Sequence, residues 1–486
     1  MQILYVISEV APWIKTGGLA DVGASLPKAL RQADMDIRLL VPAYADLLAQ
    51  ADGLRLRATL RLHDVPGRIL ETRLPSDVPV YLVDCPGFAD RHGNPYMQPD
   101  GHGWGDNAQR FNRLALAAAA FAHDLLPFRP QVIHLNDWQT GLVPVHMLQN
   151  QSQRPIKTIF TIHNLAYQGV FPAHLLPQLG IQPHWMTLDG LEFHGQLSFI
   201  KGGIACSDHI TTVSPSYAQE IQTPSYGEGL DGLLRSRNRH LSGILNGIDT
   251  DLWNPATDPY LDSHFTAEHL QGKKSNKKAL RRTLGLDKST AEQPLVAMIT
   301  RFAAQKGLDL VIEALPELMQ RSLELIILGS GDSSVENALR QAAAPFGDRI
   351  VLRLGYDEAL AHQIEAGADM FLMPSRFEPC GLNQLYSLRY GTIPIARATG
   401  GLRDTIVDAN AQHLAQGTAT GFLFEEPSAR ALLSAVDRAL ALYQDRKSWK
   451  GLMRRGMAIE CSWSRSAESY VQLYRQLLDT ARYPAG

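Results

Sequence analysis

Short apolar runs that alternate with helix-like stretches along most of the chain constrain its fold more than any other sequence feature. The runs are mostly continuous rather than alternating in polarity, which is typical of strands covered on both faces of a sheet. Stretches with helical periodicity, such as residues 308–320 and 358–366, lie between many of them. This order predicts a doubly wound α/β architecture with parallel sheets. The strand-like runs are residues 3–7, 37–42, 78–83, 132–135, 158–162, 210–213, 242–245, 295–300, 323–328, 350–354, 370–373 and 393–396.

A break in this pattern between residues 247 and 294 divides the chain in two. The segment contains Asn254 and Asp258, each followed by a proline, and a basic stretch at residues 273–278. We interpret it as a connector and an exposed helix, whose basic stretch forms either an interaction patch or, as we expect, a solvated face. A chain of 486 residues is long enough for two domains with a core each. We expect two α/β domains and a final helical segment, over residues 1–247, 248–463 and 464–486.

Charge and cysteine usage exclude several classes of function. The formal net charge is −3, so no broad positive field attracts nucleic acid or an anionic membrane. The four cysteines are widely spaced without a CxxC pair, which indicates a reducing cytosol rather than a disulfide framework or a zinc site. The apolar stretch at residues 114–126 is too short to cross a bilayer. The first residues lack the basic region of a signal peptide, so we expect a cytoplasmic protein.

Polar and glycine-rich loops follow many of the predicted strands. In open parallel sheets ligands bind at the carboxyl ends of the strands. Gly-Gly pairs at residues 17–18 and 400–401 precede helices, where backbone N–H groups and the helix dipole attract phosphate. A tight turn without a ligand is the alternative for each pair, although Lys15 beside the first favours an anion. Because such loops occur in both halves, we expect two ligand-binding edges that face each other across a deep cleft.

Charged or polar side chains after three strands each have a functional and a structural interpretation. Arg301 and Lys306 together offset the charge of a diphosphate leaving group, or else form a solvated face. Glu378 precedes a helix, where a carboxylate binds sugar hydroxyls, supports positive charge at an anomeric carbon, or caps the helix. His163 follows an apolar strand directly and either contacts a sugar hydroxyl or is structural.

Several other motifs are incomplete. The Gly-Lys pair at residues 272–273 is not a P-loop, because Ala267 stands where the first glycine is required. Residues 329–331 lack the third glycine of a dinucleotide fingerprint. Asp249 and Asp251 have the spacing of a metal-binding pair, but they lie where the connector begins, so we expect turn or capping chemistry there.

Five segments, in order along the chain, resemble those of bacterial glycogen synthases and plant starch synthases. They are residues 15–22 (Lys-Thr-Gly-Gly-Leu-Ala-Asp-Val), 163–169 (His-Asn-Leu-Ala-Tyr-Gln-Gly), 245–249 (Leu-Asn-Gly-Ile-Asp), 301–307 (Arg-Phe-x-x-Gln-Lys-Gly) and 378–382 (Glu-Pro-Cys-Gly-Leu). The resemblance implies a retaining glycosyltransferase of the GT-B fold, with two Rossmann-like domains and no metal or pyridoxal phosphate. Its activity would be transfer of glucose from ADP-glucose to the non-reducing end of an α-1,4-glucan, such as glycogen, with release of ADP.

The resemblance also implies which domain and which residues bind the acceptor and the donor. The first domain would bind the acceptor and carry one phosphate loop, the second would bind the donor, and the final helix would cross back to the first. Asp137 and Tyr96 match positions near the acceptor. The implied phosphate contacts are the cations Lys15, Arg301 and Lys306, Gly18 on the loop of Lys15, and the second phosphate loop of Thr399, Gly400 and Gly401. Asp21 is an acidic donor-site residue, and Tyr356 would stack on adenine. His163, Asn246, Glu378 and Cys380 would surround the transferred glucose.

The expected mechanism is dissociative, with Glu378, His163, Lys306, Arg301 and Asp137 taking part in catalysis. Cations neutralise the departing diphosphate, and the acceptor attacks on the face that it leaves. The wider superfamily often has a second glutamate eight residues after the first, but residue 386 is a tyrosine. The alternatives are a UDP-glucose-dependent enzyme, a starch synthase, a metal-dependent transferase, an inactive glucan-binding scaffold, and a pyridoxal-phosphate-dependent phosphorylase.

Overall fold

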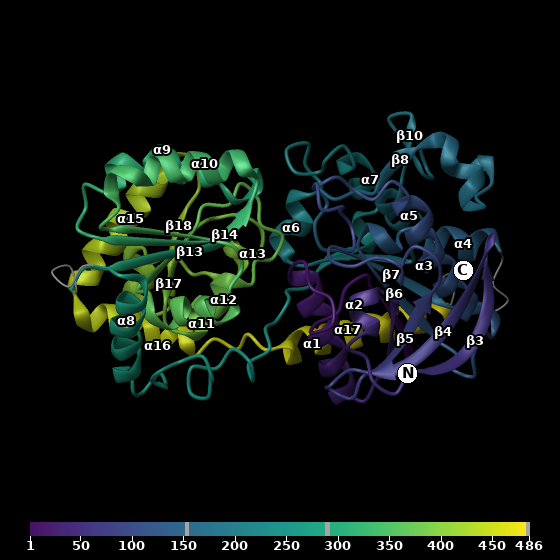
Figure 1. Ribbon diagram of the computed structural model, residues 1–486, viewed down its shortest axis with the longest axis horizontal. Coiled ribbons are helices and arrows are strands. Elements are labelled where there is room, and N and C mark those ends of the chain that lie inside the picture. The colour runs from purple at the N-terminus through teal and green to yellow at the C-terminus, as the bar shows by residue number, and fades with distance from the viewer. Residues whose placement is uncertain (151–154, 287–291, 483–486) are drawn as a thin grey trace. The chain divides into compact units, whose positions relative to one another are not determined.

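A computed structural model describes residues 1–150, 155–286 and 292–482 (Figure 1). The chain forms two compact units. Unit 1 contains Met1–Asn246 and the segment that begins at Trp463, and unit 2 contains Gly247–Ser462. Unit 2 is therefore inserted between two segments of unit 1. Among the described residues, no helix is both long and apolar enough to cross a membrane.

Unit 1 is built on a nine-stranded sheet with the order β12-β11-β7-β6-β1-β2-β5-β4-β3. The seven strands from β12 to β5 are parallel, whereas β4 and β3 form an antiparallel edge. The strand order reverses between β1 and β6, which makes this the topological switch point. The bounds are β1 Gln2–Val6, β2 Asp36–Pro42, β3 Arg55–Leu62, β4 Val65–Arg73, β5 Pro79–Asp84, β6 Val132–Asn136, β7 Lys157–Ile162, β11 His209–Thr212 and β12 Leu241–Gly243.

Helices and a small second sheet complete unit 1. Two helices begin at serine caps: Ser198 accepts a hydrogen bond from the backbone N–H of Lys201, and Ser214 accepts one from Tyr217. The small sheet has the order β8-β10-β9. The bounds are α1 Gly18–Gln32, α2 Ala45–Leu48, α3 Asn107–Ala120, α4 Val143–Gln149, α5 Phe199–Cys206, α6 Pro215–Glu220, α7 Asp231–Ser236, α17 Trp463–Arg482, β8 Val170–Pro172, β9 Glu192–Phe193, β10 Gln196–Ser198, and the 3-10 helices η1 Phe121–His123, η2 Trp138–Thr140, η3 Ala173–Leu179, η4 Pro183–Trp185 and η5 Asn238–His240.

Helix α17, the last in the described chain, belongs to the core of unit 1. It packs against α1, as Figure 1 shows with the yellow helix beside the purple one. Tyr474 is fully buried, and its hydroxyl lies 2.7 Å from Nδ1 of the equally buried His134 on β6. A segment late in the sequence thus closes one face of the first sheet.

Unit 2 contains an all-parallel sheet of six strands with the order β15-β14-β13-β16-β17-β18. Both of its faces are covered: Val296 and Met298 on β13 pack in one apolar cluster, and Leu295 and Ala297 pack in another. This explains why β13 reads as a continuous apolar run. The switch point lies between β13 and β16. The bounds are β13 Leu295–Phe302, β14 Glu324–Gly331, β15 Ile350–Leu354, β16 Met370–Met373, β17 Ile393–Arg397 and β18 Phe422–Phe424.

Aspartate and serine caps start many helices of unit 2. The side chains of Asp332, Asp357, Ser428 and Asp445 each accept a hydrogen bond from a backbone N–H in the first turn. The bounds are α8 Gln271–Leu284, α9 Leu308–Leu318, α10 Ser333–Ala343, α11 Glu358–Gly367, α12 Asn383–Arg389, α13 Gly400–Thr405, α14 Ala411–Gln416, α15 Ala429–Gln444, α16 Arg446–Met457, and the 3-10 helices η7 Ala304–Lys306 and η8 Ala344–Phe346.

The basic stretch in α8 is only partly the solvated face that the sequence predicts. Lys274 and Lys278 are exposed, but Lys273 is buried. Its ammonium donates to the carbonyls of Glu365 and Ala366 and to the Thr392 hydroxyl, at 3.1, 3.2 and 2.7 Å. Burial lowers the pKa of Lys273 to about 7. The expectation is wrong at Lys273 because this side chain joins α8 to the body of unit 2.

The antiparallel edge of unit 1 is absent from the sequence prediction. Strands β3 and β4 are joined by a two-residue turn of His63 and Asp64, and His63 has a φ of 58°. The signal was present as alternating polarity in β3, with arginine or threonine at most odd positions and leucine or alanine at even ones. A search for continuous apolar runs passes over this pattern, because an edge strand buries one face only.

Candidate functional site

The phosphate-loop candidate of unit 1 follows β1 at the switch point. Gly17 is the residue before α1 and adopts an extended backbone, and Gly18 is the exposed first residue of the helix. Lys15 pairs with Asp21 in the first turn, with 2.9 Å between Nζ and Oδ1. Three of the predicted donor residues therefore lie around one helix N-terminus, where the backbone N–H groups have no partner within the helix.

Glu9 lies beneath this loop and was missed by sequence reasoning. It is 2% exposed, and its carboxylate oxygens accept hydrogen bonds from N and Oγ1 of Thr16, at 2.5 and 2.7 Å, and from Oη of Tyr96 at 2.6 Å. Burial raises the pKa of Glu9, while these hydrogen bonds lower it. The available signal was a carboxylate within an apolar stretch directly after the first strand.

Tyr96, predicted near the acceptor, is brought to the same loop from the segment between β5 and α3. Its hydroxyl is 2.7 Å from Oγ of Ser8 as well as bonded to Glu9. Two residues of α3 hold the segment separately: Arg110 donates to the carbonyl of Pro95, and Asn107 donates to that of Tyr96, both at 2.9 Å. The position of the Tyr96 ring is therefore fixed by its main chain and by its hydroxyl.

Asp137 and His163 meet at the carboxyl ends of β6 and β7. Oδ1 of Asp137 accepts from the backbone N–H of His163 at 2.7 Å. Nε2 of His163 is 2.9 Å from Oδ1 of Asn136, whose amide group donates to the carbonyl of Val6. The hydrogen bond from the Asn136 side-chain NH₂ to Val6 identifies Oδ1 of Asn136 as an acceptor. Nε2 of His163 must therefore donate to it, so Nε2 carries the proton and Nδ1 does not. Burial lowers the pKa of His163 to about 3, so the ring is neutral.

Asp137 combines an unusual backbone with an unusual charge state. Its φ of 57° and ψ of −179° are rarely adopted by residues other than glycine, and such strain is concentrated at functional sites. The side chain is 7% exposed, and burial raises its pKa to about 7 despite hydrogen bonds from the backbone of His163 and Asn164. At neutral pH Asp137 is thus divided between its protonated and ionised forms.

In unit 2 the switch point holds an ion pair between two predicted catalytic residues. Nζ of Lys306 in η7 lies 2.9 and 2.7 Å from the two carboxylate oxygens of Glu378, which also accepts from the Ser375 hydroxyl at 2.9 Å. Gly307, with a φ of 66°, permits this approach, because a Cβ there would lie 2.1 Å from the carbonyl oxygen of Pro374. The loops after β13 and β16 are thereby packed together.

The predicted second phosphate loop packs against the backbone of Glu378. The N–H of Gly401 donates to the Glu378 carbonyl at 3.0 Å. A Cβ on Gly400 would lie 2.0 Å from that carbonyl oxygen, and a Cβ on Gly401 would lie 2.0 Å from the oxygen of Cys380. Thr399, which precedes α13, and Cys380 are both buried. The structure therefore brings this loop, Cys380 and Glu378 into one compact group.

The remaining predicted donor residues lie at other points. Arg301 is an exposed residue at the end of β13, and Asn246 is the half-buried last residue of the first segment of unit 1. Tyr356 follows β15, is 68% exposed and donates its hydroxyl to Glu358, so its ring is accessible for stacking. Tyr386, where the superfamily often has glutamate, is buried and stacks on Trp253 with 3.8 Å between ring centroids.

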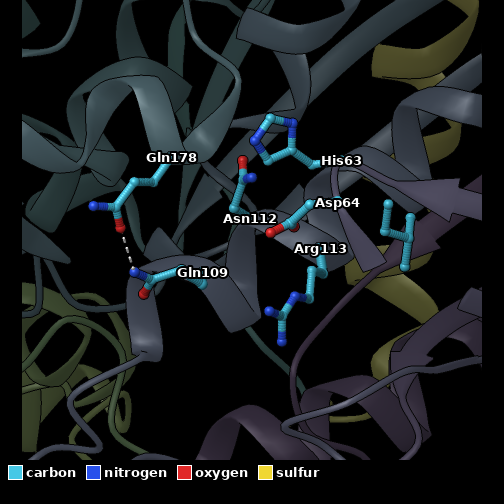
Figure 2. A pocket seen from close by; sticks show the side chains of 7 residues that line it. His63, Asp64, Gln109, Asn112, Arg113 and Gln178 are labelled. Atoms are coloured by element: carbon cyan, nitrogen blue, oxygen red, sulfur yellow. Dashed lines mark hydrogen bonds between the residues drawn. The ribbon is translucent and has the colours of Figure 1, made fainter. Parts of the chain in front are cut away.

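A cavity of about 340 Å³ in unit 1 contains none of the predicted site residues (Figure 2). It lies between the β3–β4 turn, α3 and η3, and Figure 2 shows the bond of 3.2 Å between Gln109 and Gln178. Sequence reasoning missed it because its lining comes from three distant segments. The lining residues are Leu62, His63, Asp64, Gln109, Asn112, Arg113 and Gln178.

The Asp249 and Asp251 pair forms a turn, as expected. Oδ1 of Asp249 accepts from the backbone N–H groups of Asp251 and Leu252, at 3.0 and 3.2 Å. Within the described part of the chain, no cluster of three or more His, Cys, Asp or Glu side chains is arranged to hold a metal ion.

Two family models match consecutive parts of the chain. The model described as starch synthase catalytic domain matches residues 2–236, and that of glycosyl transferases group 1 matches residues 286–452. Two bacterial proteins, glycogen synthase 1 of Methylococcus capsulatus and glycogen synthase of Thioalkalivibrio sulfidiphilus, are each 51% identical to this chain. The alignments cover 98% of this chain and 97% and 100% of those proteins.

Solved structures show the same likeness. The catalytic domain of starch synthase IV from Arabidopsis thaliana, bound to ADP and acarbose, superposes with a TM-score of 0.89 and 34% identity, covering 98% of this chain and 99% of that one. Sucrose-phosphate synthase from Thermosynechococcus elongatus has a TM-score of 0.59 and 18% identity, with 99% of both chains covered. The second likeness concerns the fold alone.

Proposed function

The chain belongs to the glycogen and starch synthase family of glycosyltransferases, and on that basis we propose that it lengthens an α-1,4-glucan with glucose from ADP-glucose. The observation that carries the proposal is the Lys306–Glu378 pair at the switch point of unit 2, with the glycine loop of α13 packed beside it. This arrangement sets a cation for phosphate, a carboxylate for the sugar and close backbone N–H groups side by side. The ADP in the related starch synthase structure supports an adenine nucleotide.

The donor diphosphate is proposed to bind Lys306, Arg301 and the loop of Thr399, Gly400 and Gly401. An ammonium has three N–H donors, so Lys306 retains one for a phosphate oxygen while it contacts both oxygens of Glu378. Charge neutralisation of the departing ADP is the largest contribution that we assign to these residues. The exposed ring of Tyr356 is proposed to stack on the adenine.

The glucose and acceptor contacts are proposed for the remaining predicted residues. Nδ1 of the neutral His163 accepts a hydrogen bond from a sugar hydroxyl, since its Nε2 proton is engaged by Asn136. Asn246 and Cys380 contact the transferred glucose, and Asp137 and Tyr96 lie towards the acceptor. The donor contacts of unit 1 are Lys15, Gly18 and Asp21.

The proposed reaction proceeds with retention of configuration. The bond between the anomeric carbon and the diphosphate breaks first, and Glu378 stabilises the positive charge that develops on the sugar. The acceptor 4-hydroxyl attacks from the side that ADP leaves, and its proton passes to the departing phosphate. We also propose a cytoplasmic location, which the four free cysteines support, and a glucan such as glycogen as the macromolecular partner.

Side-by-side transfer of radiolabelled glucose from ADP-glucose and UDP-glucose into glycogen tests the proposal. We expect label to enter the polymer from ADP-glucose at a rate at least tenfold higher. The label should be released by an enzyme that cleaves α-1,4 linkages. Preferential use of UDP-glucose would overturn the donor assignment, and failure of both donors would overturn the proposed activity.

A further inference from the structure

We propose that Glu9 is a positioning residue that couples the loop of residues 15–18 to Tyr96, and thereby couples donor binding to acceptor binding. The inference rests on the proposed function, which assigns the loop to the donor and Tyr96 to the acceptor. What it adds is a physical connection between the two, in a residue that touches neither substrate. The connection runs through a single carboxylate three residues after the end of β1.

The contacts of Glu9 divide between two segments that are far apart in the sequence. One oxygen accepts from the backbone N–H of Thr16, and the other accepts from both the Thr16 hydroxyl and the Tyr96 hydroxyl. Three donors thus converge on one carboxylate, with donor–acceptor distances between 2.5 and 2.7 Å. A shift of the loop towards a bound phosphate must therefore change the hydrogen bond that orients Tyr96.

Stability alone does not explain this carboxylate. Moving an ionisable group out of water costs free energy that its hydrogen bonds only partly offset, so an apolar side chain of similar volume is often as stable or more so. Glu9 is nevertheless 2% exposed, in a segment whose Ile7 and Val10 belong to the apolar core of unit 1. A carboxylate here is best accounted for by the orientation that it imposes on Thr16 and Tyr96.

The structure also separates this coupling from the folding of the Tyr96 segment. Arg110 and Asn107 hold the main chain of that segment from α3, without any contact to Glu9 among those described. Loss of the Glu9–Tyr96 bond should therefore leave the tyrosine hydroxyl with its Ser8 contact and no carboxylate to orient it, while the segment stays in place. This makes the coupling measurable in folded protein.

A double-mutant cycle measures the coupling. Thr16→Val removes one of the two hydroxyl donors and keeps the shape of the side chain, and Tyr96→Phe removes the other hydroxyl. We expect Thr16→Val to raise KM mainly for ADP-glucose and Tyr96→Phe to raise KM mainly for glycogen. In the double variant the fold-change in kcat/KM should differ by about 3- to 10-fold from the product of the two single fold-changes. Such a difference is expected for residues that share a hydrogen-bond partner.

The same cycle in a Glu9→Leu background, where the shared acceptor is gone, should be multiplicative within about twofold. Multiplicative effects in the presence of Glu9, or an unchanged departure in Glu9→Leu, would overturn the proposal. If Glu9→Leu does not fold, Glu9→Gln takes its place. The glutamine amide donates to the two hydroxyls instead of accepting from them, so Glu9→Gln should raise KM for both substrates. In this background the double variant should lie closer to the product of the two single fold-changes than it does with Glu9.

Asp208→Asn is the matched control for Glu9→Gln. Oδ2 of Asp208 accepts from N and Oγ1 of Thr158, at 2.8 and 3.0 Å, so Asp208 binds the same two groups of a threonine as Glu9 does. Its other oxygen pairs with Lys157 at 2.8 Å, and Thr158 lies at the opposite end of the β7 strand from His163. We expect a comparable loss in Tm with both KM values unchanged. If Asp208→Asn shifts both KM values as Glu9→Gln does, loss of stability alone explains the effect and the coupling is wrong.

Failure of the coupling and failure of the proposed function give different results. An active wild type with multiplicative cycles contradicts the coupling only. A wild type that transfers no glucose contradicts the proposed function, and calorimetric titration with ADP and with maltoheptaose then replaces KM as the readout of the same cycle. In that case equal ADP affinities with and without maltoheptaose would contradict the coupling as well.

Discussion

Three carboxylates of the candidate site show how strongly a side chain's neighbours decide its chemistry. Glu378 is paired with a lysine, Glu9 receives three neutral donors, and Asp137 is buried with only backbone N–H groups as partners. The first is suited to a sugar with developing positive charge and the second to holding a loop. The third has its pKa raised to about 7 by burial. The same functional group thus has three different environments.

Lys306→Ala tests the leaving-group role at this scale. We expect kcat with ADP-glucose to fall by about 10²- to 10³-fold, the usual cost of removing one electrostatic stabiliser of a transition state. KM for glycogen should change little, because the proposed role of Lys306 is at the donor phosphates and its described contact is with Glu378. The control is Lys277→Ala, which breaks a pair with Asp369 of 2.6 Å elsewhere in unit 2. Near-normal turnover in Lys306→Ala would contradict the assigned role.

Asp137→Asn should change how stability depends on pH. The pKa of Asp137 is about 7 in the folded protein against an ordinary value of 3.8, so the folded state binds the extra proton between these values. The contribution of Asp137 to wild-type stability therefore falls as pH rises from about 4 to 7 and is constant above. An asparagine keeps the acceptor oxygen without this penalty. Urea unfolding should show the variant gaining up to roughly 4 kcal/mol over wild type between pH 4 and pH 8, and an equal difference at both pH values would argue against the shift.

The sequence predicted the chemical character of single site residues better than it predicted which side chains they contact. Lys306 and Glu378 were predicted as cation and carboxylate from their loops, but their direct pairing depends on Gly307 and Pro374 coming together. Glu9 could not be found in this way, because its partner Tyr96 lies 87 residues along the chain. A contact between distant segments leaves no local pattern in the sequence.

At the scale of elements, burial decides which parts the sequence predicts well. The last helix, expected within residues 464–486, spans Trp463–Arg482, and the run at residues 393–396 lies within β17. The helix has helical apolar periodicity and the strand is a continuous apolar run, because both pack on a core. The run predicted at residues 242–245 overlaps only partly with the short β12 strand. The β3–β4 hairpin was missed because its polarity alternates. The expected basic face of α8 is wrong at Lys273, where a lysine points inwards.

Gly400→Ala tests the packing of α13 against the loop that carries Glu378. An added Cβ would lie 2.0 Å from the Glu378 carbonyl oxygen, so the loop must move and activity should fall at least tenfold. Gly417→Ala is the matched control: its φ of 67° is equally unfavourable for alanine, but the space around it is open. We expect both variants to lose about 1–2 kcal/mol from backbone strain, measured by thermal unfolding, and only Gly400→Ala to lose activity. Equal activity in the two variants would contradict the packing argument.

At the scale of the whole molecule, the likeness to the solved glycosyltransferase structures confirms the predicted GT-B class of two α/β units. The continuous strand-like runs predicted the two α/β units, and the resemblance to glycogen and starch synthases implied the GT-B class. The units differ in their buried histidines. Burial lowers the pKa of His134 and His163 to about 3 and of His146 and His209 to about 4, and all four belong to unit 1. In unit 2, Asp258 and Glu358 raise the pKa of His362.

We therefore expect acid to destabilise unit 1 before unit 2. The four histidines of unit 1 take up protons only on unfolding, so their contribution to stability is lost as pH falls below about 6.5. At pH 5 the loss is roughly 2 kcal/mol each for the fully buried His134 and His146. His362 acts in the opposite direction, because it favours the protonated form when folded. Hydrogen exchange by peptide at pH 5 and pH 7.5 should show loss of protection first in residues 1–246, and earlier loss in unit 2 would contradict this.

The insertion of unit 2 between β12 and α17 has a consequence for the order of biosynthesis. The ribosome delivers all strands of the first sheet by residue 243, yet the tyrosines that cover His134 emerge only after residue 470. Unit 2 is one uninterrupted stretch and can mature as soon as Ser462 has left the exit tunnel. Part of the first sheet therefore stays uncovered until unit 2 and then α17 have been synthesised. Chaperones that bind exposed apolar surface should encounter this chain during that interval.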